Sequence, residues 1–191
     1  MSSSKRGRKR QDKPRWTNPD TGDNLSAGGI LFHSNDSFWA IEEDGKKGIE
    51  TNDIGGRYEY EDGDIFTTIR RELHEETYGM CDVPVSMIRK FAETYGMKGV
   101  YDKNRQCVYV CICVPIDVIC ETCGFSEEEI EGKFASLREK TVKQNPNTPR
   151  DAYKPLRIRK IRYEDVLNGG DDLSRIGYRL QIISNQLFKG W

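Results

Sequence analysis

The segment from residue 55 to residue 80 constrains this 191-residue chain more than any other. It runs GGRYEYEDGDIFTTIRRELHEETYGM, a double glycine and an acidic loop followed by apolar residues at helical spacing. The apolar positions span an arc of roughly 100° at about 100° per residue, and they are Ile65, Phe66, Ile69 and Leu73. The pattern predicts an amphipathic helix over residues 65–77, with Asp64 as its N-cap and Gly79 near its end.

Three glutamates share one side of this predicted helix. Glu72, Glu75 and Glu76 stand at i, i+3 and i+4, and such positions are neighbours on a helix surface. Their centre lies roughly 90° from the middle of the apolar arc, so we expect them at the rim of the buried face, where a cleft can form. Crowded carboxylates repel one another, and a hard divalent cation such as Mg²⁺ or Mn²⁺ removes that cost. The tight turn at Gly55 and Gly56 would bring backbone atoms close to the same ion or to a phosphate.

The segment resembles the Nudix box, whose pattern is G-x5-E-x7-R-E-U-x-E-E-x-G-U with U an apolar residue. The stretch from Arg71 to Glu76, RELHEE, fits the R-E-U-x-E-E part at every place. The spacing upstream is one residue longer than the pattern, which leaves Asp62 and Asp64 as alternative middle acids. Downstream, Tyr78 adds one residue before Gly79. Both departures fall outside the metal-binding glutamates.

The resemblance implies metal-dependent hydrolysis of a nucleoside diphosphate linked to another group X. Water activated by Mg²⁺ or Mn²⁺ would attack a phosphoryl group. By the same resemblance, Glu72, Glu75, Glu76 and the main-chain oxygen of Gly55 would bind the metal. Arg71 would pair with a box carboxylate and orient it. We therefore assign Glu76, Glu75 and Arg71 as the catalytic residues.

The remainder of the chain indicates an α/β fold. We expect strands over 27–33, 37–42, 85–95, 106–116 and 156–163, and helices over 65–77, 126–142 and 173–187. The elements mix without a regular βαβ repeat, and their order resembles the Nudix-type α/β/α sandwich with a mixed β-sheet. We assign residues 1–20 to a basic disordered tail and residues 21–191 to a Nudix hydrolase domain.

The net charge of −1 conceals two basic segments. Residues 1–15 carry seven basic side chains and one acid without a core-forming pattern, which is typical of a disordered tail that contacts nucleic acid or directs nuclear import, or of a plain solubilising arm. Residues 138–162 carry nine basic residues against two acids, a charge that suits a polyanionic ligand. Within this segment we assign Arg157, Arg159 and Lys160 to substrate or RNA binding, although dispersed surface charges would give the same pattern.

No apolar run approaches the roughly 18 residues that a membrane span needs, and no apolar segment follows the N-terminal charges. We therefore expect an intracellular protein, cytoplasmic or nuclear, without a membrane partner. The six cysteines then are not a disulfide framework. The pairs Cys111-x-Cys113 and Cys120-x-x-Cys123 have zinc-ligand spacing, but alternation along the predicted strand favours small buried hydrophobes.

Other candidate residues remain open at this stage. Many Nudix enzymes add an acid from outside the box, and Asp151, Glu121 and Glu128 are alternatives for it. Tyr95 and Tyr101 stand where such enzymes often place a base-stacking aromatic, although core packing also explains them. His33 lacks a partner motif, and His74 takes the variable position of the box, which favours a solvated role.

Four functions compete. Decapping of RNA by release of the cap nucleotide would explain both basic segments, because phosphate neutralisation dominates nucleic-acid affinity. Housecleaning hydrolysis of small nucleotides (nucleoside triphosphates, nucleotide sugars or ADP-ribose) needs neither segment. Cleavage of diphosphoinositol polyphosphates would use the internal one. A non-catalytic nucleic-acid-binding module has no need of three mutually repelling carboxylates. We take the 5′ cap of RNA as the first substrate to test.

Overall fold

The computed structural model describes residues 13–45, 48–104, 106–145, 155–167 and 175–188. Its strands are β1 (Trp16–Thr17), β2 (Asn24–Leu25), β3 (Ala27–His33), β4 (Ser37–Gly45), β5 (Gly48–Asn52), β6 (Ile54–Arg57), β7 (Met97–Tyr101), β8 (Cys107–Pro115), β9 (Pro155–Arg162) and β10 (Arg175–Ile176). Its helices are α1 (Ile65–Glu76), α2 (Val85–Tyr95), α3 (Ile116–Cys123), α4 (Ile130–Gln144), α5 (Tyr163–Leu167) and α6 (Tyr178–Phe188), with short 3₁₀ turns at Tyr60–Asp62 and Glu127–Glu129.

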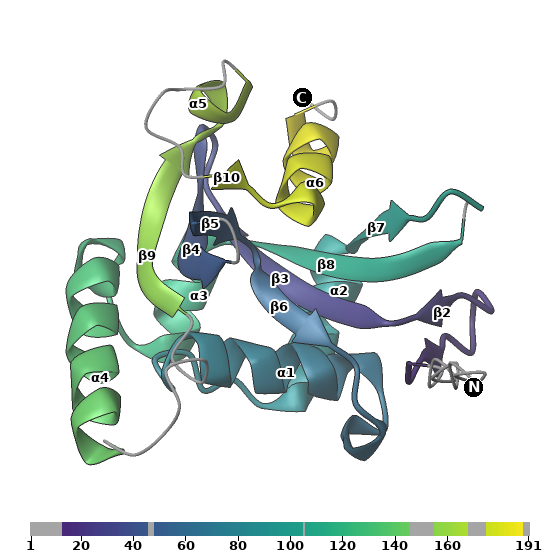
Figure 1. Cartoon of the computed structure of the whole chain (residues 1–191), viewed down its shortest axis with the longest axis horizontal. Coiled ribbons are helices and arrows are strands. Elements are labelled where there is room, and N and C mark those ends of the chain that lie inside the picture. The colour runs from purple at the N-terminus through teal and green to yellow at the C-terminus, as the bar shows by residue number, and fades with distance from the viewer. Residues whose placement is uncertain (1–12, 46–47, 105, 146–154, 168–174, 189–191) are drawn as a thin grey trace, which may run out of the picture.

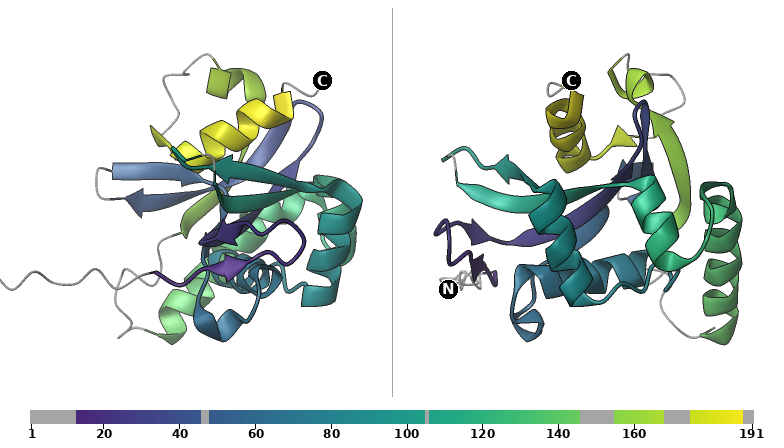
Figure 2. Two further views of the ribbon diagram at one scale, coloured as in Figure 1. Left: turned by 90° about the vertical axis from the view of Figure 1, so that its right-hand side faces the viewer. Right: turned by 180° about the vertical axis from the view of Figure 1, so that it is seen from behind.

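A mixed sheet forms the middle layer of the fold. Its main path runs β10-β5-β4-β3-β8-β7, while β6 pairs with β3 and β9 pairs with β4. The β3–β8 and β10–β5 pairs are parallel, and the other pairs in this sheet are antiparallel. Helices α1 and α2 cover one face, and α6 covers the other (Figures 1 and 2). The predicted α/β class, with helices on both sides of a mixed sheet, is confirmed.

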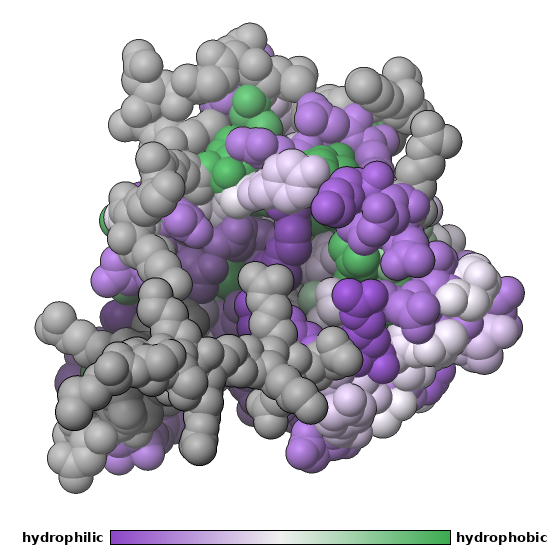
Figure 3. All heavy atoms as spheres, turned by 45° about the vertical axis from the view of Figure 1, so that its right-hand side comes forward, coloured by the Kyte–Doolittle hydropathy of each residue, from purple (hydrophilic) through white to green (hydrophobic). Residues whose placement is uncertain are grey.

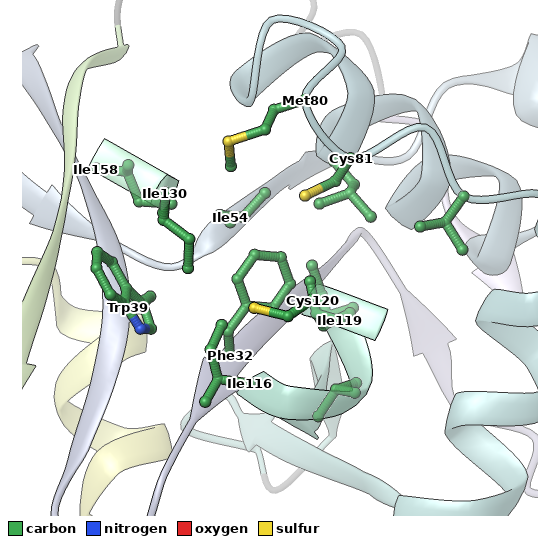
Figure 4. Close-up of a cluster of buried hydrophobic side chains, with 14 of the residues drawn as sticks. Phe32, Trp39, Ile54, Met80, Cys81, Ile116, Ile119, Cys120, Ile130 and Ile158 are labelled. Atoms are coloured by element: carbon green, nitrogen blue, oxygen red, sulfur yellow. The ribbon is translucent and has the colours of Figure 1, made fainter. Parts of the chain in front are cut away.

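Alternation along the strands separates two cores. In β3, Ile30 and Phe32 face the core under α1, while Leu31 faces the core under α6. The same two-residue period divides β4 and β8, as expected for strands covered on both faces. Figure 4 shows the larger core, where Phe32 and Cys120 meet Ile119 and where Met80 enters from the loop after α1. The outer surface of the face drawn in Figure 3 is mainly hydrophilic, with small apolar patches.

The strand expected over residues 85–95 is wrong, because this segment forms the helix α2. Its β-branched and aromatic residues suggested a strand. However, Ile88 and Phe91 are the buried positions, a spacing of three that belongs to a helix. Pro84 caps the start of α2, and Gly96 ends it with a φ of 74°.

Three further boundaries differ from expectation. The strand expected over 106–116 ends at Pro115, and the chain continues directly into α3, which the sequence did not predict. The last helix begins at Tyr178, preceded by the short strand β10. The boundary at residue 20 falls inside the β1–β2 hairpin, where Trp16 packs edge-to-face on Phe66 of α1. Residues 1–12 of the tail expected over residues 1–20 lie outside the described residues, and their assignment stays a prediction.

The helices of the structure can be compared with the length and hydrophobicity that a membrane span requires. Within the described ranges, none of the helices combines the length and the apolar character that crossing a bilayer requires.

Candidate active site

The site forms where α1 packs against β6 and β3. Asp64 caps α1 by accepting a hydrogen bond from the Thr67 amide at 2.8 Å. A cavity of about 1000 Å³ opens beside the helix. Its lining residues come from β4, β6, α1, the loop after α1, α4, β9 and α6, and they are Glu43, Gly55, Gly56, Arg57, Glu72, His74, Glu75, Glu76, Tyr78, Gly79, Thr141, Pro155 and Arg179. The three predicted glutamates and the double glycine thus share one cavity.

Glu76 is the most constrained of the three carboxylates. Its Oε2 accepts a hydrogen bond of 2.6 Å from the Gly55 amide, which ties α1 to β6. Burial raises its pKa well above 4.5, the repulsion from Glu72 adds to this effect, and the Gly55 amide opposes it. The site therefore holds Glu76 in an environment that disfavours its charge, and a nearby cation would reverse that preference.

The carboxylate of Glu72 packs against the backbone of Gly56 in β6. A Cβ built on Gly56 would overlap the Glu72 carboxylate. Gly56 is therefore required by a close approach, because any larger residue would displace Glu72 from the cavity wall. The Glu72 side chain is 13% exposed. Burial raises its pKa, and Arg71 opposes the shift.

Arg71 joins the acidic loop to the carboxylates. Its Nε and Nη2 donate to the two oxygens of Asp62 at 2.9 and 3.0 Å, and its Nη1 donates to Glu72 at 2.7 Å. A weaker contact of 3.4 Å reaches Glu75, which is 57% exposed. The hydrogen bonds that Arg71 donates to Asp62 raise the pKa of Arg71 further, so this guanidinium stays charged. The predicted orienting role of Arg71 has a geometric basis in these contacts.

The same contacts separate the two alternative middle acids. Asp62 binds Arg71 in a bidentate pair and also accepts from the Thr68 hydroxyl at 2.8 Å. Burial opposes the ionised form of Asp62, but the hydrogen bonds from Arg71 prevail and lower its pKa. Asp64 instead caps α1 and forms an ion pair with Arg89. Of the two acids, Asp62 is therefore the one that contacts Arg71, although it does not itself line the cavity.

The donor set fits a hard divalent cation such as Mg²⁺ or Mn²⁺. Carboxylate and carbonyl oxygens are the ligands that these ions take, together with water and phosphate. Glu72, Glu75, Glu76 and the Gly55 carbonyl would hold the ion. Across the described ranges, however, no three His, Cys, Asp or Glu side chains are already arranged as a metal cluster. Instead, Arg71 and the Gly55 amide hold the carboxylates by charge and hydrogen bonding.

Arg179, which was not identified from the sequence, has a guanidinium that reaches this site from the opposite face of the sheet. Arg179 of α6 lines the cavity and donates from Nη2 to the Gly55 carbonyl at 3.1 Å. Its guanidinium carbon lies 4.6 Å from the ring centroid of Tyr109. Nothing in the local sequence signals this role, because the contact joins residues 124 positions apart. The Gly55 carbonyl has a second lone pair that remains suited to a metal ion.

Asp53 lies beneath Arg179 and is fully buried. Its Oδ2 accepts from the Tyr109 hydroxyl, and its Oδ1 lies 3.5 Å from the Arg179 Nε without a hydrogen bond. Burial raises the pKa of Asp53, and the charge of Arg179 opposes this shift. The three residues before Asp53 are also polar, Glu50, Thr51 and Asn52, so no local sequence pattern distinguishes this carboxylate.

The residues assigned to RNA binding lie outside the cavity lining. Arg157 and Arg159 of β9 both bind the buried carboxylate of Glu42 on β4, with Arg159 at 2.9 Å. Lys160 lies 3.0 Å from Glu127. The structure therefore brings each of these cations to an acid, and their role in RNA binding stays a prediction.

The remaining candidates divide by position. Asp151 lies outside the described residues, and neither Glu121 nor Glu128 lines the cavity. His74 does line it, with Nδ1 at 3.3 Å from Asp82. His33 lies elsewhere, and burial lowers its pKa.

The described cysteines are free thiols. Cys111 and Cys113 lie in the core under α6, as the strand alternation predicted. Cys120 lies in the core under α1, and burial raises its pKa to about 11. These thiols therefore behave as small buried hydrophobes.

Comparisons with known proteins find similarity among solved structures alone. No family model matches the chain, and no curated protein matches it. Among solved structures, a NUDIX hydrolase from Nitrosomonas europaea aligns at 15% sequence identity with a TM-score of 0.29. The alignment covers 48% of this chain and 57% of that one. The chain thus spans little more than half of the protein it resembles.

Proposed function

We propose that this protein is a Nudix-type hydrolase that cleaves a diphosphate linkage in a nucleoside diphosphate–X substrate with the aid of Mg²⁺ or Mn²⁺. The observation that carries the proposal is the placement of Glu72, Glu75 and Glu76 with Gly55 on one cavity of about 1000 Å³. Their oxygens suit a divalent cation, and the cavity volume suits a nucleotide.

The reaction would be a hydrolysis. The oxygen of a water molecule bonds to one phosphorus, and the bridging P–O bond breaks with its electron pair remaining on the leaving phosphate. A bound divalent ion would supply charge neutralisation and a lower pKa for the attacking water. The proton released from water passes to a carboxylate, for which Glu75 is the most accessible of the three. Arg71 keeps Glu72 in place, and the Gly55 amide keeps Glu76 in place.

Arg179 supplies a positive charge on the cavity wall outside the box. A guanidinium binds phosphate oxygens through its fixed set of N–H donors. Arg179 is 31% exposed and has a hydrogen-bonding partner in the Gly55 carbonyl. We assign it to binding the diphosphate next to the glutamates.

Two substrate classes follow from different observations. Capped RNA is supported by the basic N-terminal segment, whose charge of +6 over residues 1–15 suits a polyanion. Small nucleotides are supported by the pairing of Arg157 and Arg159 with Glu42, which leaves less positive charge for RNA on β9. We place capped RNA first, and the cleavage chemistry is the same for both.

The test uses RNA labelled only in its 7-methylguanosine cap, incubated with Mg²⁺ or Mn²⁺. Release of 7-methyl-GDP by the wild type and not by Glu76→Gln would support decapping. Without release, cleavage within a panel of ADP-ribose, nucleotide sugars, nucleoside triphosphates and diphosphoinositol polyphosphates would support another member of the proposed class. A folded protein that cleaves none of these with metal present would overturn the proposal.

A further inference from the structure

Helix α1 ends with an unusual residue in a left-handed position. The Gly79 amide donates to the His74 carbonyl at 2.7 Å, and the Tyr78 amide donates to the Glu75 carbonyl at 3.2 Å. This is a Schellman ending, in which the first residue past the cap takes the left-handed conformation and is usually glycine. That residue is Tyr78, with a φ of 54°, and it is the one described non-glycine residue with a positive φ.

The strained position coincides with the departure from the box pattern. The pattern E-E-x-G places glycine directly after Thr77, where this chain has Tyr78. A bulky residue at positive φ costs free energy, and such outliers gather at functional sites because the surroundings enforce them. Tyr78 therefore calls for a role that its side chain performs.

The contacts of the Tyr78 side chain hold it at the cavity wall. Its hydroxyl donates to the Pro155 carbonyl at 2.7 Å, which also accepts from the Arg138 Nε at 3.0 Å. Its ring meets Phe134 of α4 edge-to-face, with centroids 5.3 Å apart. Tyr78 is partly buried against the larger core, and it lines the cavity together with Pro155 and Thr141. It is thus fixed by contacts from two other elements.

The other aromatic candidates lie elsewhere. Tyr95 packs on Phe91 within α2, and Tyr101 is 56% exposed on β7. Neither lines the cavity. Of the described residues that do line it, Tyr78 is the one phenylalanine, tyrosine or tryptophan.

We propose that Tyr78, with Pro155 and Thr141, forms the subsite for the nucleobase of the substrate, an inference that rests on the proposed hydrolysis. Tyr78 follows directly on the helix that carries Glu72, Glu75 and Glu76, and all four residues line the same cavity. A nucleotide with its diphosphate at the glutamates would therefore place its base against Tyr78. The π-face of tyrosine stacks on any base, so the subsite selects a planar ring.

Binding tests the inference without requiring turnover. Isothermal titration compares AMP and GMP with ribose 5-phosphate, which has the same phosphate and no base. We expect wild-type protein to bind the two nucleotides at least tenfold more tightly than ribose 5-phosphate, and Tyr78→Leu to lose this preference. Tyr78→Gly should lose it too while giving the left-handed position its favoured residue, so retained cooperative melting would show that the fold persists. Tyr78→Phe should keep the preference, as should the control Tyr101→Leu.

Steady-state kinetics distinguish a role of Tyr78 in base specificity from a purely structural role. Tyr78→Leu should raise KM for ADP-ribose about tenfold with little change in kcat, and should leave cleavage of the base-free P1,P2-dimethyl diphosphate unchanged. An equal loss on both substrates, or an unchanged base preference in the binding assay, would overturn the inference. A wild type that prefers AMP over ribose 5-phosphate but cleaves no diphosphate would instead overturn the proposed function and leave the subsite in place.

Discussion

Replacing Glu76 with Gln should have opposite effects on activity and on the stability of the metal-free protein. The substitution keeps the shape of the side chain and an oxygen that accepts the Gly55 amide hydrogen bond. It removes a carboxylate whose pKa burial and Glu72 raise well above 4.5. The wild type therefore carries an unfavourable charge at this position above that pKa, and the variant does not.

The direction with pH follows from proton binding. Because the pKa of Glu76 is higher in the folded state, the folded protein binds more protons than the unfolded chain in the interval above 4.5. The contribution of Glu76 to the stability of the metal-free wild type consequently falls as pH rises through that interval. We expect Glu76→Gln to be more stable than the wild type by on the order of 1 kcal/mol at pH 8. The difference should vanish below about pH 4.5.

Metal should reverse the order of stability. An ion at 100 times its dissociation constant stabilises the folded protein by about 2.7 kcal/mol, or roughly 5–11 °C in Tm for a chain of this size. Glu76→Gln should lose most of this increment and lower turnover by at least a hundredfold, about 2.7 kcal/mol of barrier. Thermal unfolding with and without Mn²⁺ at pH 5 and pH 8 measures both effects. An equal Mn²⁺ increment in both proteins, or a metal-free variant less stable than the wild type at pH 8, would refute the reasoning.

Three further substitutions probe the surroundings of the carboxylates. Asp62→Asn should lower the free energy of unfolding by about 2 kcal/mol at pH 7, measured by urea unfolding, because it removes the ion pair with Arg71 that lowers the pKa of Asp62. The difference in stability between the wild type and this variant should shrink as pH falls below 3.8. Gly56→Ala should lower turnover at least tenfold with an unchanged circular dichroism spectrum, since its Cβ would displace the adjacent carboxylate. Arg179→Gln should raise KM for the diphosphate about tenfold and lower Tm, because Asp53 loses its counter-charge. Adding Asp53→Asn should restore Tm but not KM, and recovery of both would show that Arg179 acts only through Asp53.

The local sequence was sufficient to predict helix α1, but not the contacts that other parts of the chain make with it. The apolar arc, the Asp64 cap and the glutamate spacing predicted α1 correctly because all three are properties of neighbouring residues. Motif spacing left Asp62 and Asp64 as equal alternatives, because the two residues differ only in the side chains and backbone groups that they contact in the folded protein. Asp62 binds Arg71, whereas Asp64 caps α1.

The wrong or missing predictions have two causes. A sequence pattern was compatible with both a strand and a helix, or the contact joined residues far apart in the sequence. The segment of α2 is rich in residues that favour strands, and its helical period rests on few buried positions, Ile88 and Phe91. The basic pattern of β9 did not reveal that Glu42 lies across from it on β4. Arg179 reaches the site only because α6 packs on the sheet beside β5, a contact that no local pattern encodes.

The most direct test of the central claim follows the oxygen of the attacking water. Capped RNA, ADP-ribose, nucleotide sugars, nucleoside triphosphates and diphosphoinositol polyphosphates are each incubated with the protein and Mn²⁺ in water enriched in ¹⁸O, and the products are analysed by mass spectrometry. Metal-dependent hydrolysis at the glutamates predicts one ¹⁸O atom in a single phosphate product of at least one substrate, and cleavage at least a hundredfold slower by Glu76→Gln. Cleavage that continues unchanged in Glu76→Gln, or intact substrates in the presence of Mn²⁺-bound wild type, would contradict the account.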